Sequence, residues 1–367
     1  MADGVRNEYL PTEVSPPGAT LREVLDDRET SQSDLATRMG RPKKTISEII
    51  NGKASITPET ALELELVLGI PATFWNARER EYRAFLARLE QAKRMSRQLK
   101  WLRNFPIGAL AKEGWITKHS NKQDQLKELL QFFGVASPEQ WQDVFNNVAV
   151  AFRKSSAFKS DAYSLAAWLR CGPIKAEQYQ CRSFDKARFL MALREVRSLT
   201  PSDPEVFEPE MMRVCADAGV VVTFVPQLPK SRVSGATRWL SPDKALIQLS
   251  IRYRTNDHLW FTFFHEAAHI LLHGKRLIFL ETGRSTGKHE TEANRWAAEF
   301  LIPSGPYAEF LSTGTYGKMA IRQFADTIGV AAGIVVGRLQ HDGVLPHSHC
   351  NDLKVRLIWA RHSEPAA

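Results

Sequence analysis

Two histidines and a glutamate within one apolar segment are the residues of this chain best placed to do chemistry. Residues 259–274 are apolar nearly all round and end at Gly274, which predicts a buried helix. His265 and His269 are four residues apart, so they lie on one face of that helix and can bind one Zn²⁺. Glu266 is rotated toward the side of a metal-bound water, which completes an H-E-x-x-H motif. The segment therefore predicts a metal site with Glu266 as its catalytic group.

A catalytic zinc site needs a third protein ligand, and no third histidine follows at the short spacing typical of metzincins. Residues 289–303 predict a second helix, and the side chains expected on its buried face are Ala293, Trp296, Ala297 and Phe300. We expect Glu292 to be the third ligand because it adjoins this apolar stripe. Glu290, expected before or at the helix start, is the alternative. His273 lies one turn beyond His269, out of reach of the same tetrahedral ion, and is interpreted as a structural or supporting residue.

These two segments resemble the ImmA/IrrE family of metallopeptidases over roughly residues 210–310. The resemblance is carried by the H-E-A-A-H helix ending in Leu-Leu-His-Gly and by the later stretch E-x-E-A-N-R-W-A-A-E-F-L-I-P. It implies three zinc ligands, His265, His269 and Glu292. It also implies that Glu266 is the general acid/base, taking a proton from water and passing it to the leaving amine, and that the substrates are repressor proteins of the helix-turn-helix type. Mn²⁺ or Fe²⁺ is an alternative to Zn²⁺, because sites of two histidines and one glutamate accept all three ions.

A second functional module is predicted between residues 20 and 75, where short helical patterns follow one another closely. One helix begins at Ser31 and ends near Gly40, and the next runs from Lys43 to Gly52. The side chains expected to be buried between them are Leu35, Ala36, Ile46 and Ile49. This leaves Lys43 pointing outward together with Lys44, Ser47 and Glu48, as in a helix-turn-helix whose second helix enters the major groove.

This module resembles Xre-type phage repressors, and its continuation over residues 56–75 is similar to the HigA-type antitoxin branch. The resemblance implies binding to a double-stranded DNA operator, as a homodimer with two half-sites. We expect DNA contacts from Gln32, Arg41, Lys43, Lys44, Thr45 and Ser47. Gln32 would cap the reading helix against a phosphate, and the two lysines favour guanine or phosphate over adenine. The alternative is a helical bundle used only for dimerisation.

The elements around these motifs predict a fold that is mainly α with a small β-sheet (α+β). A sheet is expected from the β-branched or apolar runs 219–225 and 245–249, with 237–240 between them; its edge could receive an extended substrate. Residues 99–215 carry aromatic and leucine stripes at helical spacing, which we interpret as core. The expected divisions are 1–17 flexible arm, 18–76 DNA-binding domain, 77–205 helical middle region, 206–310 peptidase domain and 311–367 helical hairpin and tail.

Composition narrows the class of protein. With 367 residues, 43% hydrophobic and 25% charged, the chain is long enough for two or three packed domains. No apolar run is long enough for a membrane helix or resembles a signal peptide, so we expect a cytoplasmic protein without membrane contact. The four cysteines have no C-x-x-C pairing and are expected to be reduced thiols.

These observations predict a DNA-binding transcriptional regulator that also carries a zinc-dependent endopeptidase domain. The peptidase would hydrolyse helix-turn-helix repressor-type proteins, in trans or in cis. The competing hypothesis is a non-catalytic HigA-like antitoxin or repressor, with a toxin as its partner and the peptidase fold as a sensor. The intact Glu266 favours the enzyme, because a pure metal-binding scaffold has no need of a carboxylate beside the water.

Overall fold

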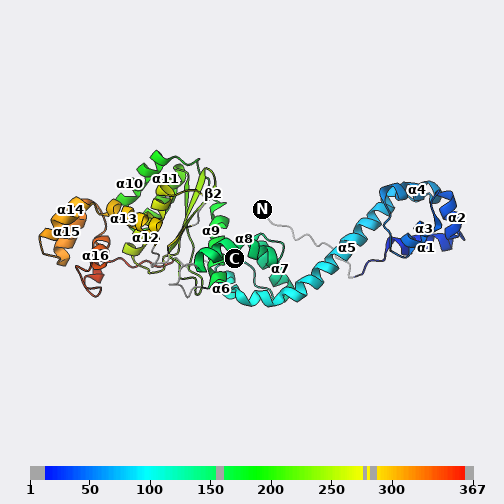
Figure 1. Ribbon diagram of the computed structural model, residues 1–367, viewed down its shortest axis with the longest axis horizontal. Helices are drawn as coiled ribbons and strands as arrows, with labels where there is room; N and C mark the ends of the chain where they lie inside the picture. The colour runs from blue at the N-terminus through cyan, green and yellow to red at the C-terminus, as the bar shows by residue number, and fades with distance from the viewer. Residues whose placement is uncertain (1–12, 154–160, 276–278, 282–286, 360–367) are drawn as a thin grey trace. The chain divides into compact units, whose positions relative to one another are not determined.

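A computed structural model describes residues 13–153, 161–275, 279–281 and 287–359. The chain separates into two compact units, residues 1–99 and 100–367, here called the N-terminal unit and the C-terminal unit. Figure 1 shows the N-terminal unit in blue and cyan, and the C-terminal unit runs from cyan to red. Each unit has its own buried hydrophobic core, so each is described by itself.

The N-terminal unit is a bundle of short helices followed by one long helix. Its described helices are α1 (Pro17–Asp27), α2 (Gln32–Arg38), α3 (Lys43–Ile50), α4 (Pro58–Leu68) and α5 (Ala72–Gln98). Ser31 Oγ accepts a hydrogen bond from Asp34 N and caps α2, while Gly40 adopts φ +64° in the turn before α3. Leu35, Ala36, Ile46 and Ile49 are all buried, as predicted.

The first part of the C-terminal unit is helical, as its aromatic stripes predicted. It comprises η1 (Leu99–Asn104), α6 (Ile107–Lys112), α7 (Lys122–Phe133), α8 (Pro138–Arg153), α9 (Ala162–Ala176), α10 (Lys186–Ser198) and α11 (Pro204–Asp217). Trp101, Phe105, Phe133 and Trp141 pack against one another with ring centroids 4.5–6.3 Å apart. These rings form a packed core, and no chemistry is assigned to them.

A four-stranded mixed sheet follows, in the order β1-β3-β2-β4. Its strands are β1 (Val220–Phe224), β2 (Gly235–Ser241), β3 (Lys244–Leu249) and β4 (Phe279–Glu281). Three of them were predicted and β4 was not. The pairing of β1 with β3 is parallel, and the other two pairings are antiparallel. The runs 219–225 and 244–249 were both expected to be able to supply a substrate edge. This is wrong for 244–249, because β3 lies between β1 and β2, whereas β1 lies at an edge of the described sheet.

The two faces of the sheet carry different elements, since alternate side chains of a strand point to opposite sides. Leu246 and Val221 pack with Ala176 of α9 on one face. Ile247 and Leu249 belong to the main core on the other face, beneath α12 (Asn256–Leu272). Helix α12 is therefore buried in the middle of the unit, as the apolar sequence predicted.

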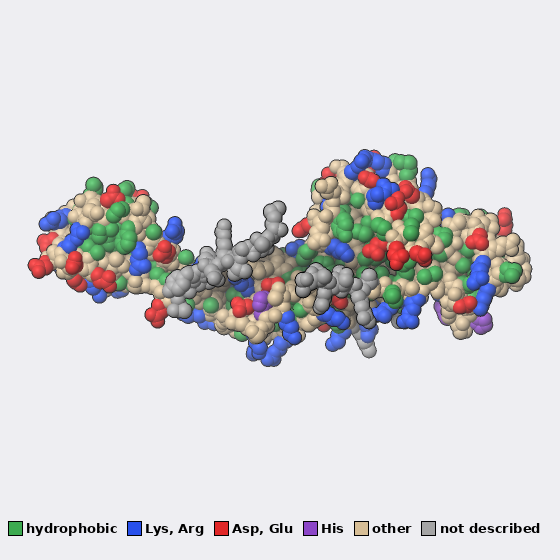
Figure 2. Space-filling view, turned by 180° about the vertical axis from the view of Figure 1, so that it is seen from behind, with side chains coloured by type: hydrophobic (Ala, Val, Ile, Leu, Met, Phe, Trp, Pro, Cys, Tyr) green, Lys and Arg blue, Asp and Glu red, His purple; other side chains and the backbone are tan. Residues whose placement is uncertain are grey.

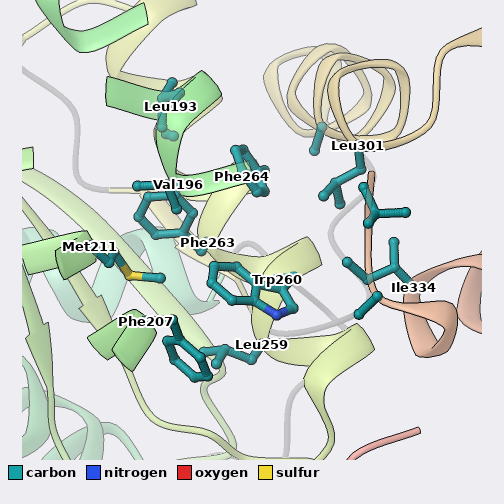
Figure 3. Close-up of a cluster of buried hydrophobic side chains, with 14 of the residues drawn as sticks. Leu193, Val196, Phe207, Met211, Leu259, Trp260, Phe263, Phe264, Leu301 and Ile334 are labelled. Carbon is teal, nitrogen blue, oxygen red and sulfur yellow. The ribbon is translucent and has the colours of Figure 1, made fainter. Parts of the chain in front are cut away.

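The remaining helices complete the same core. They are α13 (Lys288–Leu301), α14 (Ser304–Ser312), α15 (Lys318–Ile328), α16 (Ala332–His341) and the short η2 (Asn351–Leu353). Figure 3 shows Trp260 and Phe263 of α12 between Met211 of α11, Leu301 of α13 and Ile334 of α16. Burying several large apolar side chains, each worth about 1.5–3 kcal/mol, holds α12 rigidly in place.

Two polar contacts fix the ends of the helices that carry the site. At the start of α12, Asp257 forms a buried ion pair with Lys354 at 2.7 Å, so the chain after α16 anchors this helix. At the end of α13, Arg197 of α10 donates hydrogen bonds to the carbonyl oxygens of Leu301 and Ile328. The first contact thus holds α12 to the chain after η2, and the second holds the end of α13 to α10.

The observed structure confirms the predicted fold class, mainly α with a small β-sheet. No single described helix is long and apolar enough to cross a membrane. The bent pair α15 and α16 passes on length and composition, and most of its apolar side chains belong to the core, although Met319 is exposed. The four cysteines are free thiols, and burial raises the pKa of Cys171 and Cys215 well above the usual range.

Candidate functional site

Helix α12 brings the predicted His265 and His269 together on one face. Their Nε2 atoms are 3.0 Å apart, and their side chains have no solvent exposure. Glu266 is also fully buried. Two imidazoles and a carboxylate inside an apolar helix are costly to bury unless they have polar or metal partners, so this segment marks a functional site.

The third member of this group is Glu290, from the first turn of α13. Glu290 Oε2 lies 3.2 Å from His265 Nε2, and Glu290 Oε1 lies 3.6 Å from His269 Nε2. His265, His269 and Glu290 form a buried group suited to a metal ion, here called the first cluster. The structure thus corrects the choice of Glu292, which does not lie in this cluster.

The correction follows from where α13 begins. The helix begins at Lys288, so Glu290 is already helical and is not a residue before the helix start. The buried side chains of α13 are Glu290, Ala293, Ala297 and Leu301, spaced as one helical face. Glu292 is two residues further on and therefore rotated by about 200° from Glu290. Its carboxylate lies with His273 and His289 instead.

The donor set of the first cluster fits a divalent metal ion. Ligand atoms about 2.0–2.1 Å from a tetrahedral ion are about 3.4 Å from one another, close to the 3.0–3.6 Å separations of the first cluster. The Nδ1 atoms of both histidines have other partners, Asn294 Oδ1 at 2.8 Å and His273 Nδ1 at 2.9 Å. Both Nε2 atoms are therefore directed to one point, together with the carboxylate of Glu290.

The charges of the cluster also suit a cation. Burial lowers the pKa of His269 to about 4, so its imidazole is neutral at pH 7 and has a lone pair to offer. Burial alone would favour the neutral form of Glu290, but contacts with His265 and His269 hold the pKa of this carboxyl at about 2. At neutral pH the cluster therefore offers the neutral imidazole of His269 and the carboxylate of Glu290.

Strand β2 fixes the position of Glu266. Thr237 Oγ1 donates a hydrogen bond to the backbone oxygen of Glu266 at 3.1 Å. The backbone of Gly235 also approaches Glu266, since a Cβ atom added at this glycine would lie 2.8 Å from Glu266 Oε1. Only glycine leaves room for this carboxylate, so β2 can lie directly against the predicted catalytic group.

Two residues of the site were missed at the sequence level. Asn294 stands within the stretch E-x-E-A-N, four residues after Glu290, but its contact with His265 depends on how α12 packs on α13. Gly235 opens a strand, and nothing in its neighbours indicates that Glu266 lies against it. Asn294 could have been found from its spacing, because it lies one turn after Glu290 on the same helix.

Asn294 gives the first testable prediction. Asn294→Ala removes the acceptor that fixes the tautomer of His265, and loss of such an outer partner weakens metal binding about 10–100-fold. Asn294→Asp keeps an acceptor oxygen and should bind metal close to wild-type affinity. Competition with a chelator of known affinity measures both. Equal affinity of wild type and Asn294→Ala would show that the hydrogen bond to His265 has no part in metal binding.

The predicted DNA-contacting residues lie on one small part of the N-terminal unit. Lys43 and Lys44 are exposed at the start of α3, and Thr45 and Ser47 follow half-buried on the same helix. Gln32 is the first residue of α2 and is also half-buried. Lys44 faces Glu48 one turn on, with a charge separation of 3.8 Å and 84% of its side chain exposed. Both lysines can therefore reach a partner.

Arg41 is held within the unit. Its Nη2 donates to Glu63 Oε1 of α4 at 3.1 Å, and its Nε pairs with the other oxygen of the same carboxylate. A two-bond contact of this kind fixes the guanidinium plane. The side chain connects the turn before α3 to α4, so Arg41 positions α3 in this conformation.

The geometry defines two classes of structure, a helix-turn-helix unit and an α+β unit with a buried His-His-Glu group beside a glutamate. Comparison with known families agrees for both. Residues 21–75 match the helix-turn-helix family, and residues 215–340 match the IrrE N-terminal-like domain of the Peptidase_M78 family. The chain thus carries a helix-turn-helix domain and an IrrE N-terminal-like domain of the Peptidase_M78 family.

Similar proteins that match part of the chain include one regulator and two antidote proteins. The uncharacterized HTH-type transcriptional regulator YddM of Escherichia coli (strain K12) is 36% identical over 59 residues, which are 16% of this chain and 63% of YddM. An addiction module antidote protein of the HigA family from Coxiella burnetii is 27% identical over 24% of this chain and 96% of its own, with a TM-score of 0.22. An antidote protein of a plasmid maintenance system from Nostoc punctiforme is 26% identical over 23% and 94%, with a TM-score of 0.23.

Proposed function

We propose that the C-terminal unit is a zinc-dependent endopeptidase whose metal is bound by His265, His269 and Glu290. The supporting observation is the first cluster itself: its two histidine nitrogens are 3.0 Å apart, each lies 3.2 or 3.6 Å from an oxygen of Glu290, and Glu266 is next to His265 on α12. Zn²⁺ suits this donor set, and Mn²⁺ or Fe²⁺ would also accept it.

The residues of the chain have distinct tasks in hydrolysis. A zinc ion bound at the first cluster supplies Lewis acidity toward water and the scissile carbonyl. Glu266 acts as general base, taking a proton from the attacking water, and then passes this proton to the nitrogen of the leaving amine. The absence of a side chain at Gly235 leaves the space that the Glu266 carboxylate occupies. Asn294 holds His265 in the tautomer that ligates through Nε2.

The substrates that we propose are helix-turn-helix repressor-type proteins, cut in trans or in cis. The chain itself contains a helix-turn-helix module, so the experiment also looks for cleavage of this chain in cis. The test incubates full-length protein, loaded with one equivalent of Zn²⁺, with repressors of this class and identifies new peptide ends by mass spectrometry. Cleavage that stops after metal removal and returns with Zn²⁺ supports the proposal; an unchanged substrate contradicts it.

The alternative is an antitoxin-like repressor that uses the peptidase fold as a sensor, with a toxin as partner. The burial of His265, Glu266 and His269, each at most 1% exposed, is the observation that favours it. A substrate must reach these groups, whereas a sensed ion need only be bound. The two functions are separated by the variant of Glu266 argued in the Discussion.

For the N-terminal unit we propose operator binding through α3. Lys43→Ala combined with Lys44→Ala should weaken binding and lower the salt dependence, because each lost phosphate contact reduces the slope of log K against log salt by about 0.9. Fluorescence anisotropy with duplex DNA over a range of salt concentrations measures both. Lys93→Ala combined with Arg94→Ala removes the same charge from α5, outside the helix-turn-helix, and should change neither. Identical slopes for the two double variants would refute the role of α3.

A homodimer is part of this proposal. Four large apolar side chains among the described residues of the N-terminal unit are exposed, Leu62 at 57%, Leu66 at 85%, Phe74 at 40% and Leu89 at 41%. Leu62 and Leu66 are four residues apart on α4, so they share one helix face. In the space-filling view, hydrophobic side chains gather on the visible face of this unit among charged ones (Figure 2). A second copy that covers such side chains would place two α3 helices on one operator.

A further inference from the structure

A second group of metal-ligating side chains lies next to the first cluster. It consists of His273, His289 and Glu292, here called the second cluster, whose ligand atoms all lie within 4.8 Å of one another. His273 directly follows α12, while His289 and Glu292 belong to the first turns of α13. The same pair of helices therefore builds both clusters, and their packing sets both geometries.

The separations within the second cluster suit a divalent ion. His273 Nε2 is 3.2 Å from Glu292 Oε2, and His289 Nδ1 is 3.9 Å from the same oxygen. These values bracket the separation of about 3.4 Å between ligands of a tetrahedral zinc ion. The ring centroids of His273 and His289 are 4.3 Å apart, so small side-chain rotations can direct one nitrogen of each ring toward a shared ion.

The second cluster differs from the first in its access to solvent. The His273 side chain is 2% exposed, that of Glu292 34% and that of His289 54%. The cluster thus has one buried ligand and two near the surface. An ion can enter and leave there directly, and water can complete its coordination. Exposed ligands are also less fixed, so this site should bind more weakly than the first.

We propose that His273, His289 and Glu292 form a second divalent metal site, distinct from the proposed catalytic centre and of lower affinity. Two imidazole nitrogens and one carboxylate oxygen suit Zn²⁺. The existence of this site depends only on the second cluster. Its coupling to the first cluster, described next, rests on the proposed function.

A hydrogen bond connects the two clusters. His269 Nδ1 and His273 Nδ1 are 2.9 Å apart, and such a contact needs one donor and one acceptor. When His269 ligates through Nε2, its Nδ1 carries the hydrogen and donates it. His273 then accepts through Nδ1, and its own hydrogen is on Nε2, directed at Glu292 Oε2. This arrangement supports the first site when the second is empty.

An ion at the second cluster requires the Nε2 lone pair of His273. A neutral His273 that ligates through Nε2 carries its hydrogen on Nδ1, where it faces the hydrogen on His269 Nδ1. Two donors cannot share one bond, so this contact must break or distort. Loss of an outer partner weakens a metal site about 10–100-fold, and coupling between two sites is reciprocal. We therefore expect each ion to weaken the binding of the other.

The test measures Zn²⁺ bound to untagged full-length protein by equilibrium dialysis and elemental analysis. Wild type should bind two equivalents at saturation, and His289→Ala should bind one. His341→Ala removes another exposed histidine, one that belongs to no metal-suited group among the described residues, and should still bind two. Saturation of wild type at one equivalent that His289→Ala retains, or two equivalents in His289→Ala, would overturn the site.

Glu290→Ala separates this proposal from the proposed function. It removes a ligand of the first cluster only, so the second cluster should still bind one ion that His289→Ala abolishes. If coupling exists, the Kd of that ion is about 10–100-fold lower in Glu290→Ala than in the second binding step of wild type. Equal values would overturn the coupling but leave the site. A protein that binds only the ion sensitive to His289→Ala would instead contradict the catalytic centre.

Discussion

Glu266→Gln is expected to stop repressor cleavage while the protein keeps its metal. Glutamine preserves the size of the side chain but cannot accept a proton from water at neutral pH. Positioned general bases contribute about 10²–10⁴ in rate, so turnover should fall at least about a hundredfold. Glu266 does not belong to the first cluster, and the space beside Gly235 that its carboxylate occupies suits an isosteric amide. Metal content and thermal unfolding should therefore match those of wild type.

The matched control is Glu309→Gln, which makes the same chemical change at an exposed position of α14. Cleavage is followed at saturating substrate, so that loss of turnover is distinguished from loss of binding. DNA binding by Glu266→Gln should persist, because the helix-turn-helix belongs to the other unit. Genes under the operator would then stay locked in one state.

The opposite result would favour the sensor function over the endopeptidase. If wild type and Glu266→Gln behave alike in cleavage assays and in induction of the regulated genes, Glu266 has no catalytic task. The antitoxin-like repressor then replaces the endopeptidase as the function of this chain. Metal removal would still alter induction in that case, since the first cluster would remain the sensing element.

Much of the fold could be predicted because the signals are local. The apolar segment around His265 is long and ends at a glycine, and α12 was found within a few residues of its observed bounds. The β-branched runs gave β1, β2 and β3, whereas β4 has three residues and pairs only with β2. So short a strand has no periodicity to detect, and its pairing depends on distant residues.

The errors at the site arise from tertiary structure. Choosing between Glu290 and Glu292 required the helix start, which is the least certain feature of a sequence pattern. A shift of two residues turns a helix face by about 200°, so a small error at the boundary selected the wrong carboxylate. The contact of Arg41 with Glu63 also depends on tertiary structure, because it joins residues 22 positions apart in the sequence. Sequence spacing alone does not show which partner an exposed-looking arginine meets.

Glu290→Ala is expected to empty the first cluster. Glu290 provides the only carboxylate oxygens of that group, at 3.2 and 3.6 Å from the two ligating nitrogens. Loss of an outer partner already costs about 10–100-fold in affinity, and a direct ligand should cost more. After dialysis against metal-free buffer, wild type should keep about one equivalent and Glu290→Ala much less. Circular dichroism checks that the variant is folded.

Glu292→Ala is the matched comparison, since it makes the same truncation two residues away on the same helix. Glu292 is 34% exposed and reaches His269 only through His273, so the variant should keep about one tightly bound equivalent. A modest loss of affinity is expected because the hydrogen bond that orients His273 disappears. The reverse outcome, an empty site in Glu292→Ala and a full one in Glu290→Ala, would mean that α13 begins later than observed. It would then be Glu292 that faces the two histidines, and the second cluster would not exist as described.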